Sequence, residues 1–93
     1  MGDRIQFVDK TGYHHKHITH LATDAQRFTR KEVVRRVEKD PFSFFVYEKG
    51  DVAFLEVITD DVHGKYVRTI PDGKLDDNLL SLPACPPFLP LVA

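Results

Sequence analysis

One segment of this 93-residue sequence has a strong helical signature, and it limits what the rest of the chain can form. Thr29 and Glu32 have the spacing of a capping box, in which the threonine hydroxyl accepts from the Glu32 amide and the glutamate reaches back. An apolar stripe at helical spacing follows, made by Val33, Val34 and Val37. Pro41 disfavours the α conformation of the residue before it. We therefore predict a helix over residues 29–39, too short to persist unless it packs on another layer.

The segments around this helix have the composition of strands and turns. Aromatic and β-branched residues alternate weakly or cluster in them, and residues typical of turns separate them. Lys49-Gly50-Asp51 joins two such segments and indicates a hairpin. The strands are predicted over residues 4–9, 14–23, 42–48, 52–59 and 65–70.

These elements together predict an α+β fold in the order β-β-α-β-β-β. The simplest arrangement is a small antiparallel sheet of about five strands with one helix packed on a face. A short C-terminal helical turn follows. We expect a single domain over residues 1–84 and a Pro-rich tail over residues 85–93, which either lies extended over an apolar face or is loose. A content of 42% hydrophobic and 29% charged residues is typical of a globular chain.

Polar residues gather before the last leucines of the sequence. Asp77 and Asn78 are good N-caps for a short helical turn. Arg68 then acts as a strut: it makes charge-assisted hydrogen bonds to Asp72, Asp76 or Asp77 and so holds the C-terminal segment against the sheet. An apolar surface is covered by the side chains of Leu79, Leu80 and Leu82. The alternative is a polar site for an anion, formed by Arg68, Thr69, Asp72, Asp77 and Asn78. We favour the strut, because turn and capping chemistry accounts for each residue type.

Four short motifs occur in a characteristic order along the chain. They are "ITHL", "TRKEVV", "YVRT" and "DNLLSLP", which begin at residues 18, 29, 66 and 77. Their order and spacing resemble the bacterial family called domain of unknown function 3892, from the first strand to about Pro83. That family has no assigned activity, ligand or catalytic residue. The resemblance therefore implies one small domain of bacterial or phage origin and supplies no chemistry.

Histidines are the first candidates for a metal site. In a strand, His15 and His17 share a face, a spacing that can place two imidazoles on one Zn²⁺, with His63 or an Asp as the third ligand. Such histidines are more often exposed and weakly basic near neutral pH. A metal site also needs three or four converging ligands with supporting hydrogen bonds. We therefore expect neither a metal nor another cofactor.

A basic stripe is the second candidate site. Lys31, Arg35 and Lys39 lie four residues apart, opposite the valines, and such a stripe can follow a phosphate backbone. Interspersed acids and a net charge of −1 favour instead an ordinary solvated face. Glu32 and Arg36 also stand four apart in the order that supports an ion pair.

Nothing in the sequence indicates catalysis. Ser43 and Ser81 lack a Gly-x-Ser-x-Gly context, and Cys85 lies in the Pro-rich tail, a poor place to fix a nucleophile. We therefore expect a protein that is not an enzyme.

Surplus apolar residues favour a non-catalytic binding or accessory module that works through protein contacts, with a protein partner or a homodimer. More apolar side chains are present than one short helix can cover, among them Phe54, Ile58, Phe88, Leu89 and Leu91. Nucleic-acid binding through the basic stripe is the alternative. The expected location is the cytoplasm and not a membrane, because no apolar run forms a signal peptide or a spanning helix.

Overall fold

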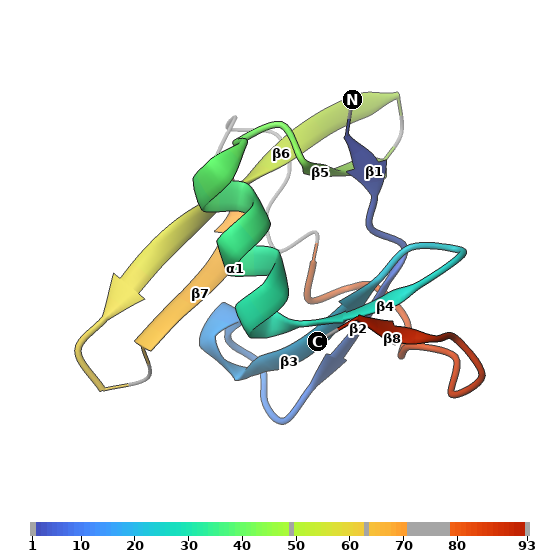
Figure 1. Cartoon of the computed structure of the whole chain (residues 1–93), viewed down its shortest axis with the longest axis horizontal. Helices are drawn as coiled ribbons and strands as arrows, with labels where there is room; N and C mark the ends of the chain where they lie inside the picture. The colour runs from blue at the N-terminus through green and yellow to red at the C-terminus, as the bar shows by residue number, and fades with distance from the viewer. Residues whose placement is uncertain (1, 49, 63, 71–78, 93) are drawn as a thin grey trace.

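Two four-stranded sheets and one α-helix make up the fold (Figure 1). The computed structural model describes residues 2–48, 50–62, 64–70 and 79–92. The sheets have the strand orders β1-β5-β6-β7 and β2-β3-β4-β8. The elements are β1 (Asp3–Arg4), β2 (Phe7–Lys10), the 3₁₀ turn η1 (His15–His17), β3 (Ile18–Ala22), β4 (Arg27–Thr29), α1 (Arg30–Lys39), β5 (Phe44–Glu48), β6 (Asp51–Asp60), β7 (Gly64–Thr69) and β8 (Leu91–Val92). The α+β class is confirmed, whereas the prediction of a single antiparallel sheet of about five strands is wrong.

The predicted first strand is divided between the two sheets. β1 pairs in parallel with β5, and β2 pairs antiparallel with β3. The chain crosses from one sheet to the other between these strands. There the Ile5 N–H donates to the Phe45 carbonyl at 2.8 Å, and the Gln6 N–H donates to the Ala22 carbonyl at 2.8 Å. Alternating side chains at residues 4–9 indicated an extended segment, but alternation does not reveal which strand each half pairs with.

The predicted second strand begins four residues later than expected. Residues 15–17 form η1, because backbone groups bond within the loop and not to a neighbouring strand. The His17 N–H donates to the His14 carbonyl at 2.8 Å, and the Lys16 N–H donates to Nδ1 of His14 at 3.1 Å. Local side chain-to-backbone bonds of this kind compete with sheet formation. Only residues 18–22 of the predicted segment form a strand.

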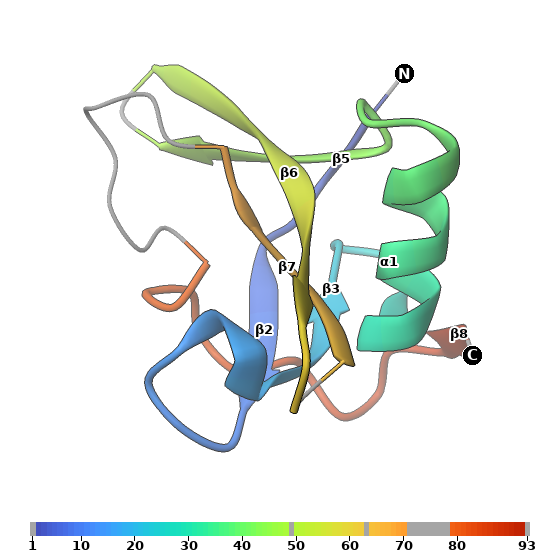
Figure 2. The same cartoon turned by 90° about the vertical axis from the view of Figure 1, so that its left-hand side faces the viewer.

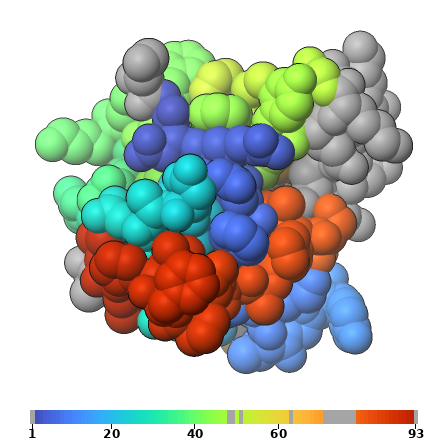
Figure 3. All heavy atoms as spheres, turned by 90° about the vertical axis from the view of Figure 1, so that its right-hand side faces the viewer, coloured from blue at the N-terminus to red at the C-terminus, as the bar shows by residue number. Residues whose placement is uncertain are grey.

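The Pro-rich tail packs on the second sheet. β8 pairs in parallel with β4, and the Arg27 N–H donates to the Pro90 carbonyl at 2.8 Å. Cys85 and Leu89 are buried in a small cluster with Ala22. Figure 3 shows the C-terminal segment (red) beside the β3–β4 segment (cyan) on one face of the molecule. The tail therefore covers this sheet and leaves Phe54 partly exposed on the other.

The predicted helix is confirmed to within one residue. α1 begins after Thr29, whose hydroxyl accepts from the Glu32 N–H at 3.2 Å. It ends before Asp40, whose N–H donates to the Arg36 carbonyl at 2.8 Å. The valine stripe is buried as expected. Among the described residues, no helix has the length and apolar character that crossing a bilayer requires.

The core lies where α1 meets both sheets. α1 contacts β6 and β7 on one side and β3 and β4 on the other (Figure 2). Phe28 of β4 and Phe44 of β5 meet edge to face, with ring centroids 5.3 Å apart, and each is 1% exposed. An aromatic pair of this geometry stabilises the fold by more than the burial of its apolar area alone. These two rings join the sheets directly.

The predicted hairpin after the helix is confirmed. β5 and β6 pair antiparallel, with Tyr47 opposite Val52. Gly50 lies in the turn of this hairpin and has a φ of +85°, a backbone conformation that residues with a Cβ rarely adopt. β7 then pairs antiparallel with β6 as the next strand, as predicted.

The last leucines hold the chain end against the core. The predicted cap residues Asp77 and Asn78 lie outside the described residues. Residues 79–81 form a turn and not a helix, and the Leu82 N–H donates to the Leu79 carbonyl at 3.3 Å. The predicted short C-terminal helical turn is therefore not found in the part that the structure describes. Leu79 itself is fully buried, and Leu80 and Leu82 pack against the same core cluster, as predicted.

Replacing Leu79 tests how firmly this segment is held. We expect Leu79→Ala to lower the free energy of unfolding by about 2–5 kcal/mol, because it leaves a cavity in the core. Phe88→Ala is the matched control and should change it by less than about 0.5 kcal/mol, since Phe88 is 82% exposed. Urea unfolding followed by circular dichroism measures both. Equal effects of the two substitutions would contradict the packing described for Leu79.

Candidate functional site

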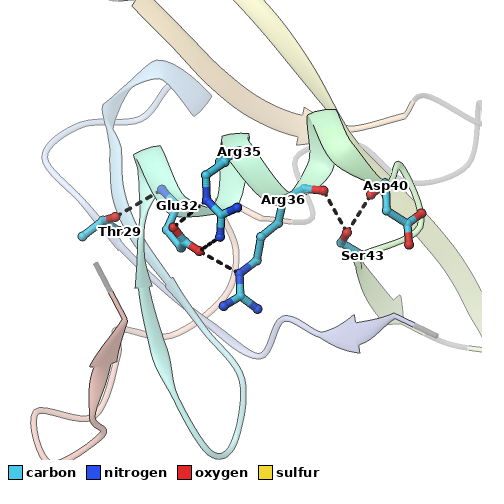
Figure 4. A network of polar contacts seen from close by, with 6 residues as sticks. All are labelled: Thr29, Glu32, Arg35, Arg36, Asp40 and Ser43. Carbon is cyan, nitrogen blue, oxygen red and sulfur yellow. Dashed lines mark hydrogen bonds and ion pairs between the residues drawn. The ribbon is translucent and has the colours of Figure 1, made fainter.

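Helix α1 carries a network of charged side chains on its first two turns (Figure 4). The Glu32 carboxylate accepts from Nε of Arg35 at 3.1 Å, from Nη2 of Arg35, and from Nε of Arg36 at 2.9 Å. The predicted pair of Glu32 and Arg36 is thus confirmed. These bonds to Arg35 and Arg36 lower the pKa of Glu32 from 4.5 to about 2. In the predicted capping box only the Thr29 hydroxyl bond is present among the described contacts, because the carboxylate turns toward the arginines.

The three residues of the predicted basic stripe lie on the outer side of α1. Lys31, Arg35 and Lys39 are all exposed, opposite the buried valines. Arg35 keeps 61% of its side chain in contact with solvent although it is bonded to Glu32. Lys31 and Lys39 make none of the ion pairs found among the described residues. The stripe is therefore positive at both ends and partly neutralised in its middle.

Hollows flank this stripe. One, of about 600 Å³, lies beside Arg36 and Lys39 and also contains Asp3 and Asp40. A second, of about 870 Å³, lies beside Lys31 and Arg35 and includes Lys65 of β7 together with two glutamates. The pair between Lys65 Nζ and Glu38 Oε2, at 2.6 Å, joins α1 to β7. Sequence reasoning missed Lys65, because only tertiary packing brings the start of β7 beside the helix.

Ser43 has a structural position at the end of α1. Its hydroxyl lies 3.0 Å from the Arg36 carbonyl and 2.7 Å from the Asp40 carbonyl (Figure 4). These carbonyls already accept from the Asp40 and Ser43 N–H groups, so the hydroxyl adds a further donor at the C-terminus of the helix. Ser43 is thus placed as a cap and not beside a general base.

The metal candidates do not share a strand face. His15 and His17 lie on η1, whereas the zinc hypothesis needed them on one side of a strand. The ring of His14 packs edge to face against those of His15 and His17, with centroids 6.0 and 6.3 Å away. His63 lies outside the described residues. Within the described part of the chain, no three His, Cys, Asp or Glu side chains gather in a way that would hold a metal ion.

Arg68 faces a neighbouring strand. Its Nε lies 3.7 Å from Oε2 of Glu56, its cross-strand neighbour, and 43% of its side chain is exposed. An exposed pair of this kind contributes at most about 1 kcal/mol. The acidic partners predicted for it, Asp72, Asp76 and Asp77, and the proposed ligand residue Asn78 lie outside the described residues. The strut therefore stays a prediction.

Cys85 is held in an environment that suppresses its reactivity. Burial is the main cause that raises the pKa of its thiol from 9.0 to about 11, and the nearby Asp9 carboxylate raises it further. Oδ1 of Asp9 also accepts from the Cys85 N–H at 3.0 Å. Since the thiolate is the nucleophilic form, this thiol is poorly suited to nucleophilic attack near neutral pH.

An apolar surface lies on the side of β5 and β6 that faces away from the core. Cross-strand pairing places Phe45 opposite Phe54 and Tyr47 opposite Val52, all on one face of the hairpin. Phe42 packs edge to face on Phe54, with centroids 5.0 Å apart, and the Ile70 N–H donates to the Phe54 carbonyl at 2.9 Å. We call this set the outer apolar face: Phe42, Phe45, Tyr47, Val52, Phe54 and Ile70.

Much of the outer apolar face is in contact with solvent. Phe42 is 59% exposed, Val52 48% and Tyr47 46%, while the alternate residues Val46 and Ala53 are buried beneath them. Arg4 lies over the Tyr47 ring, 5.3 Å from its centroid, and forms a basic rim. Of the surplus apolar residues named from the sequence, Phe54 lies on this face, Phe88 is exposed elsewhere and Leu89 is buried. The most exposed residues of the outer apolar face itself, Phe42, Val52 and Tyr47, had not been singled out.

Comparison with known proteins places the chain in a family. Residues 4–83 match the family described as protein of unknown function (DUF3892), so the chain belongs to that family and the predicted resemblance is confirmed. No curated protein and no solved structure matches it.

Glu32→Gln tests the charged network on α1. Because the folded-state pKa of Glu32 is about 2 against an ordinary 4.5, the ionised carboxylate stabilises the fold above about pH 4.5, and this contribution is lost as the pH falls toward 2. We expect the urea midpoints of wild type and variant to differ most near neutral pH and to converge below about pH 4.5.

Glu38→Gln is the matched control for this experiment. Its carboxylate pairs with Lys65 on the surface, where 44% of the Glu38 side chain is exposed, so the substitution should change the midpoint little. If the difference in urea midpoint between wild type and Glu32→Gln stayed constant from neutral pH down to about pH 2, this result would contradict the lowered pKa of Glu32.

Proposed function

We propose that this protein is a non-catalytic binding module that acts through protein contacts, with the outer apolar face as its contact surface. The observation that carries the proposal is the exposure of Phe42 at one end of this face and of the cross-strand pair Tyr47 and Val52 at the other, with Phe45 and Phe54 between them. We further propose that it works in the cytoplasm of a bacterial cell, on the sequence grounds given above.

The chemistry of this face suits a protein partner. Aromatic side chains are enriched at the centres of protein interfaces, where they offer a large apolar area at low cost in conformational entropy. Phe42 and Phe45 already pack on Phe54, so their rings lose little freedom on binding. Arg4 at the rim offers a cation to an acidic group of the partner. A cluster of apolar residues that is rimmed by a charge is typical of a docking surface.

The size of the molecule is compatible with such a contact. A stable interface buries roughly 800 Å² on each partner. The whole chain exposes 5675 Å², so this contact would cover about a seventh of it. The hairpin strand β6, with ten residues, is the longest strand described and gives the face a rigid support.

The double variant Tyr47→Ser/Val52→Ser tests the proposal. Both side chains are about half exposed, so their loss should leave the fold intact while removing the part of the contact surface nearest the hairpin turn. Sedimentation velocity over a wide range of concentrations first distinguishes a second copy of the chain from a different partner. Pull-down from the host lysate, compared between wild type and variant, then tests a different partner. We expect at least about a tenfold loss of association.

Val62→Ser/Phe88→Ser is the matched control. These residues are 83% and 82% exposed but lie outside the outer apolar face, so association should be unchanged. The proposal fails if wild type is monomeric at every concentration and recovers no partner. It fails equally if the test and control variants lose association to the same extent.

Nucleic-acid binding through α1 is the second candidate function. It is favoured by one observation: Lys31 and Lys39 are exposed at the two ends of the basic stripe and belong to none of the ion pairs among the described residues. Two of the acids beside the stripe, Glu32 and Glu38, are already bonded to Arg35, Arg36 or Lys65. Contacts to phosphates by such side chains release counterions, so binding would weaken steeply with added salt.

Fluorescence anisotropy with a labelled oligonucleotide tests this candidate. Lys31→Gln/Lys39→Gln should weaken binding and reduce the dependence of log K on log salt by about 2. Arg4→Gln/Arg68→Gln removes the same charge from the sheet and should leave binding unchanged. Absence of any binding at low salt, or equal weakening by both pairs, would exclude the stripe as a nucleic-acid site.

A further inference from the structure

The edge of β5 that faces β1 is only partly paired. β1 pairs with Phe44 and Phe45, and the chain then turns toward the second sheet at Gln6. β5 itself continues to Glu48. Within the described part of the chain, no strand pairs with the last three residues of β5 on this side. Figure 3 shows the N-terminal segment (dark blue) beside the hairpin (yellow-green) at this edge.

The backbone groups of Tyr47 point out of this edge. The Phe45 carbonyl accepts from the Ile5 N–H at 2.8 Å, and in an antiparallel pair the residue two positions further along a strand faces the same edge. The Tyr47 carbonyl accepts from a side chain, Nη2 of Arg4, at 3.3 Å. No hydrogen bond from the Tyr47 N–H to the N-terminal segment is found among the described residues. A free N–H and a weakly bonded carbonyl at a sheet edge can pair with one more strand.

The exposed apolar area beside this edge is small. A large apolar side chain has an area on the order of 200 Å², so four that are each about half exposed present roughly 400 Å² together. These four are Phe42, Tyr47, Val52 and Ile70. A stable interface between two folded proteins needs roughly 800 Å² on each partner. A second copy of the chain would need contacts beyond this face, whereas a short extended segment would not.

Arg4 gives this edge a positive charge that a partner can use. Its guanidinium lies 5.3 Å from the centroid of the Tyr47 ring, and its bond to the Tyr47 carbonyl is exposed. A long, exposed bond of this kind contributes little, so a backbone N–H of a partner can replace it at small cost. The guanidinium is then available to a carboxylate, which it binds with charge-assisted hydrogen bonds.

We propose that the outer apolar face binds a short extended segment of its partner, which pairs with β5 at Tyr47 as an added strand. Alternate side chains of this segment are apolar and lie on the face, and an acidic side chain lies beside Arg4. In such strand addition, main-chain bonds give affinity and alternate side chains give specificity. The inference rests on the proposed contact function and names the kind of segment that the face fits.

Selection of random octapeptides displayed on phage, with the whole chain immobilised, provides the probe. We expect enriched peptides to have apolar residues at alternate positions and an Asp or Glu next to them. The best of these, made synthetically, is then added to the protein, and amide hydrogen exchange is followed by NMR. The Tyr47 amide should exchange rapidly in the free protein and become protected in the complex. The Val46 amide points toward β6, should be protected in both states and serves as the internal control.

Tyr47→Pro and Tyr47→Ser form a matched pair for the main-chain bond. Both remove the ring, but only proline removes the N–H, and proline is tolerated where an edge N–H faces solvent. We expect Tyr47→Pro to bind the peptide about tenfold more weakly than Tyr47→Ser. Arg4→Gln should weaken binding roughly threefold, whereas Lys39→Gln on α1 should leave it unchanged. If Tyr47→Pro does not fold, exchange of the Tyr47 amide in wild type decides.

Three outcomes would overturn strand addition. They are the absence of any enriched peptide, enriched peptides whose apolar residues recur three or four positions apart as on a helix, and a Tyr47 amide that stays unprotected in the complex. None of these removes the contact function by itself. That function is tested separately by Tyr47→Ser/Val52→Ser in sedimentation and pull-down, so the two failures can be told apart.

Discussion

The structure depends on one packing arrangement: the valine stripe of α1 lies at the junction of the two sheets, over the Phe28–Phe44 pair. Neither sheet is large by itself. β1 and β8 have two residues each and β4 has three, so their ladders supply few hydrogen bonds. Small sheets of this kind need a shared apolar layer to be stable. The helix and the two rings provide that layer, and the rest of the fold is arranged around it.

The positions of the binding surfaces follow from this arrangement. Burial of the valines leaves Lys31, Arg35 and Lys39 exposed, because the 3.6-residue period of the helix places these residues on the side away from the valine stripe. In β5 and β6, successive side chains point to opposite faces of the sheet, and this alternation likewise separates buried from exposed residues. Burial of Val46 and Ala53 in the core presents Tyr47 and Val52 to solvent on the other side. The molecule thus presents a basic stripe on α1 and an apolar face on the β5–β6 hairpin.

Local chemistry accounts for what the sequence predicted correctly. The helix is marked by its Thr29 cap, the valine spacing and Pro41, all of which lie within a few residues of one another. The β5–β6 hairpin is marked by Gly50 between two aromatic-rich segments. Leu79 was expected to plug an apolar surface, and it is buried. The helix and the hairpin are each decided by neighbours along the chain, whereas Leu79 was predicted from its apolar character alone.

Long-range pairing accounts for what the sequence did not predict. The parallel pairs of β1 with β5 and of β4 with β8 join segments about 40 and 65 residues apart, and no local pattern marks them. The segment around His15 and His17 has strand-like composition, but its backbone bonds close a loop instead.

Native-state hydrogen exchange on wild type and Phe28→Leu tests most directly whether the two sheets form one unit through this core. If they do, the slowest amides of β3 and of β6 open with the same free energy, and the substitution lowers both by the same amount. A loss of protection confined to β3, with β6 unchanged, would mean that the sheets are held independently and would contradict the account.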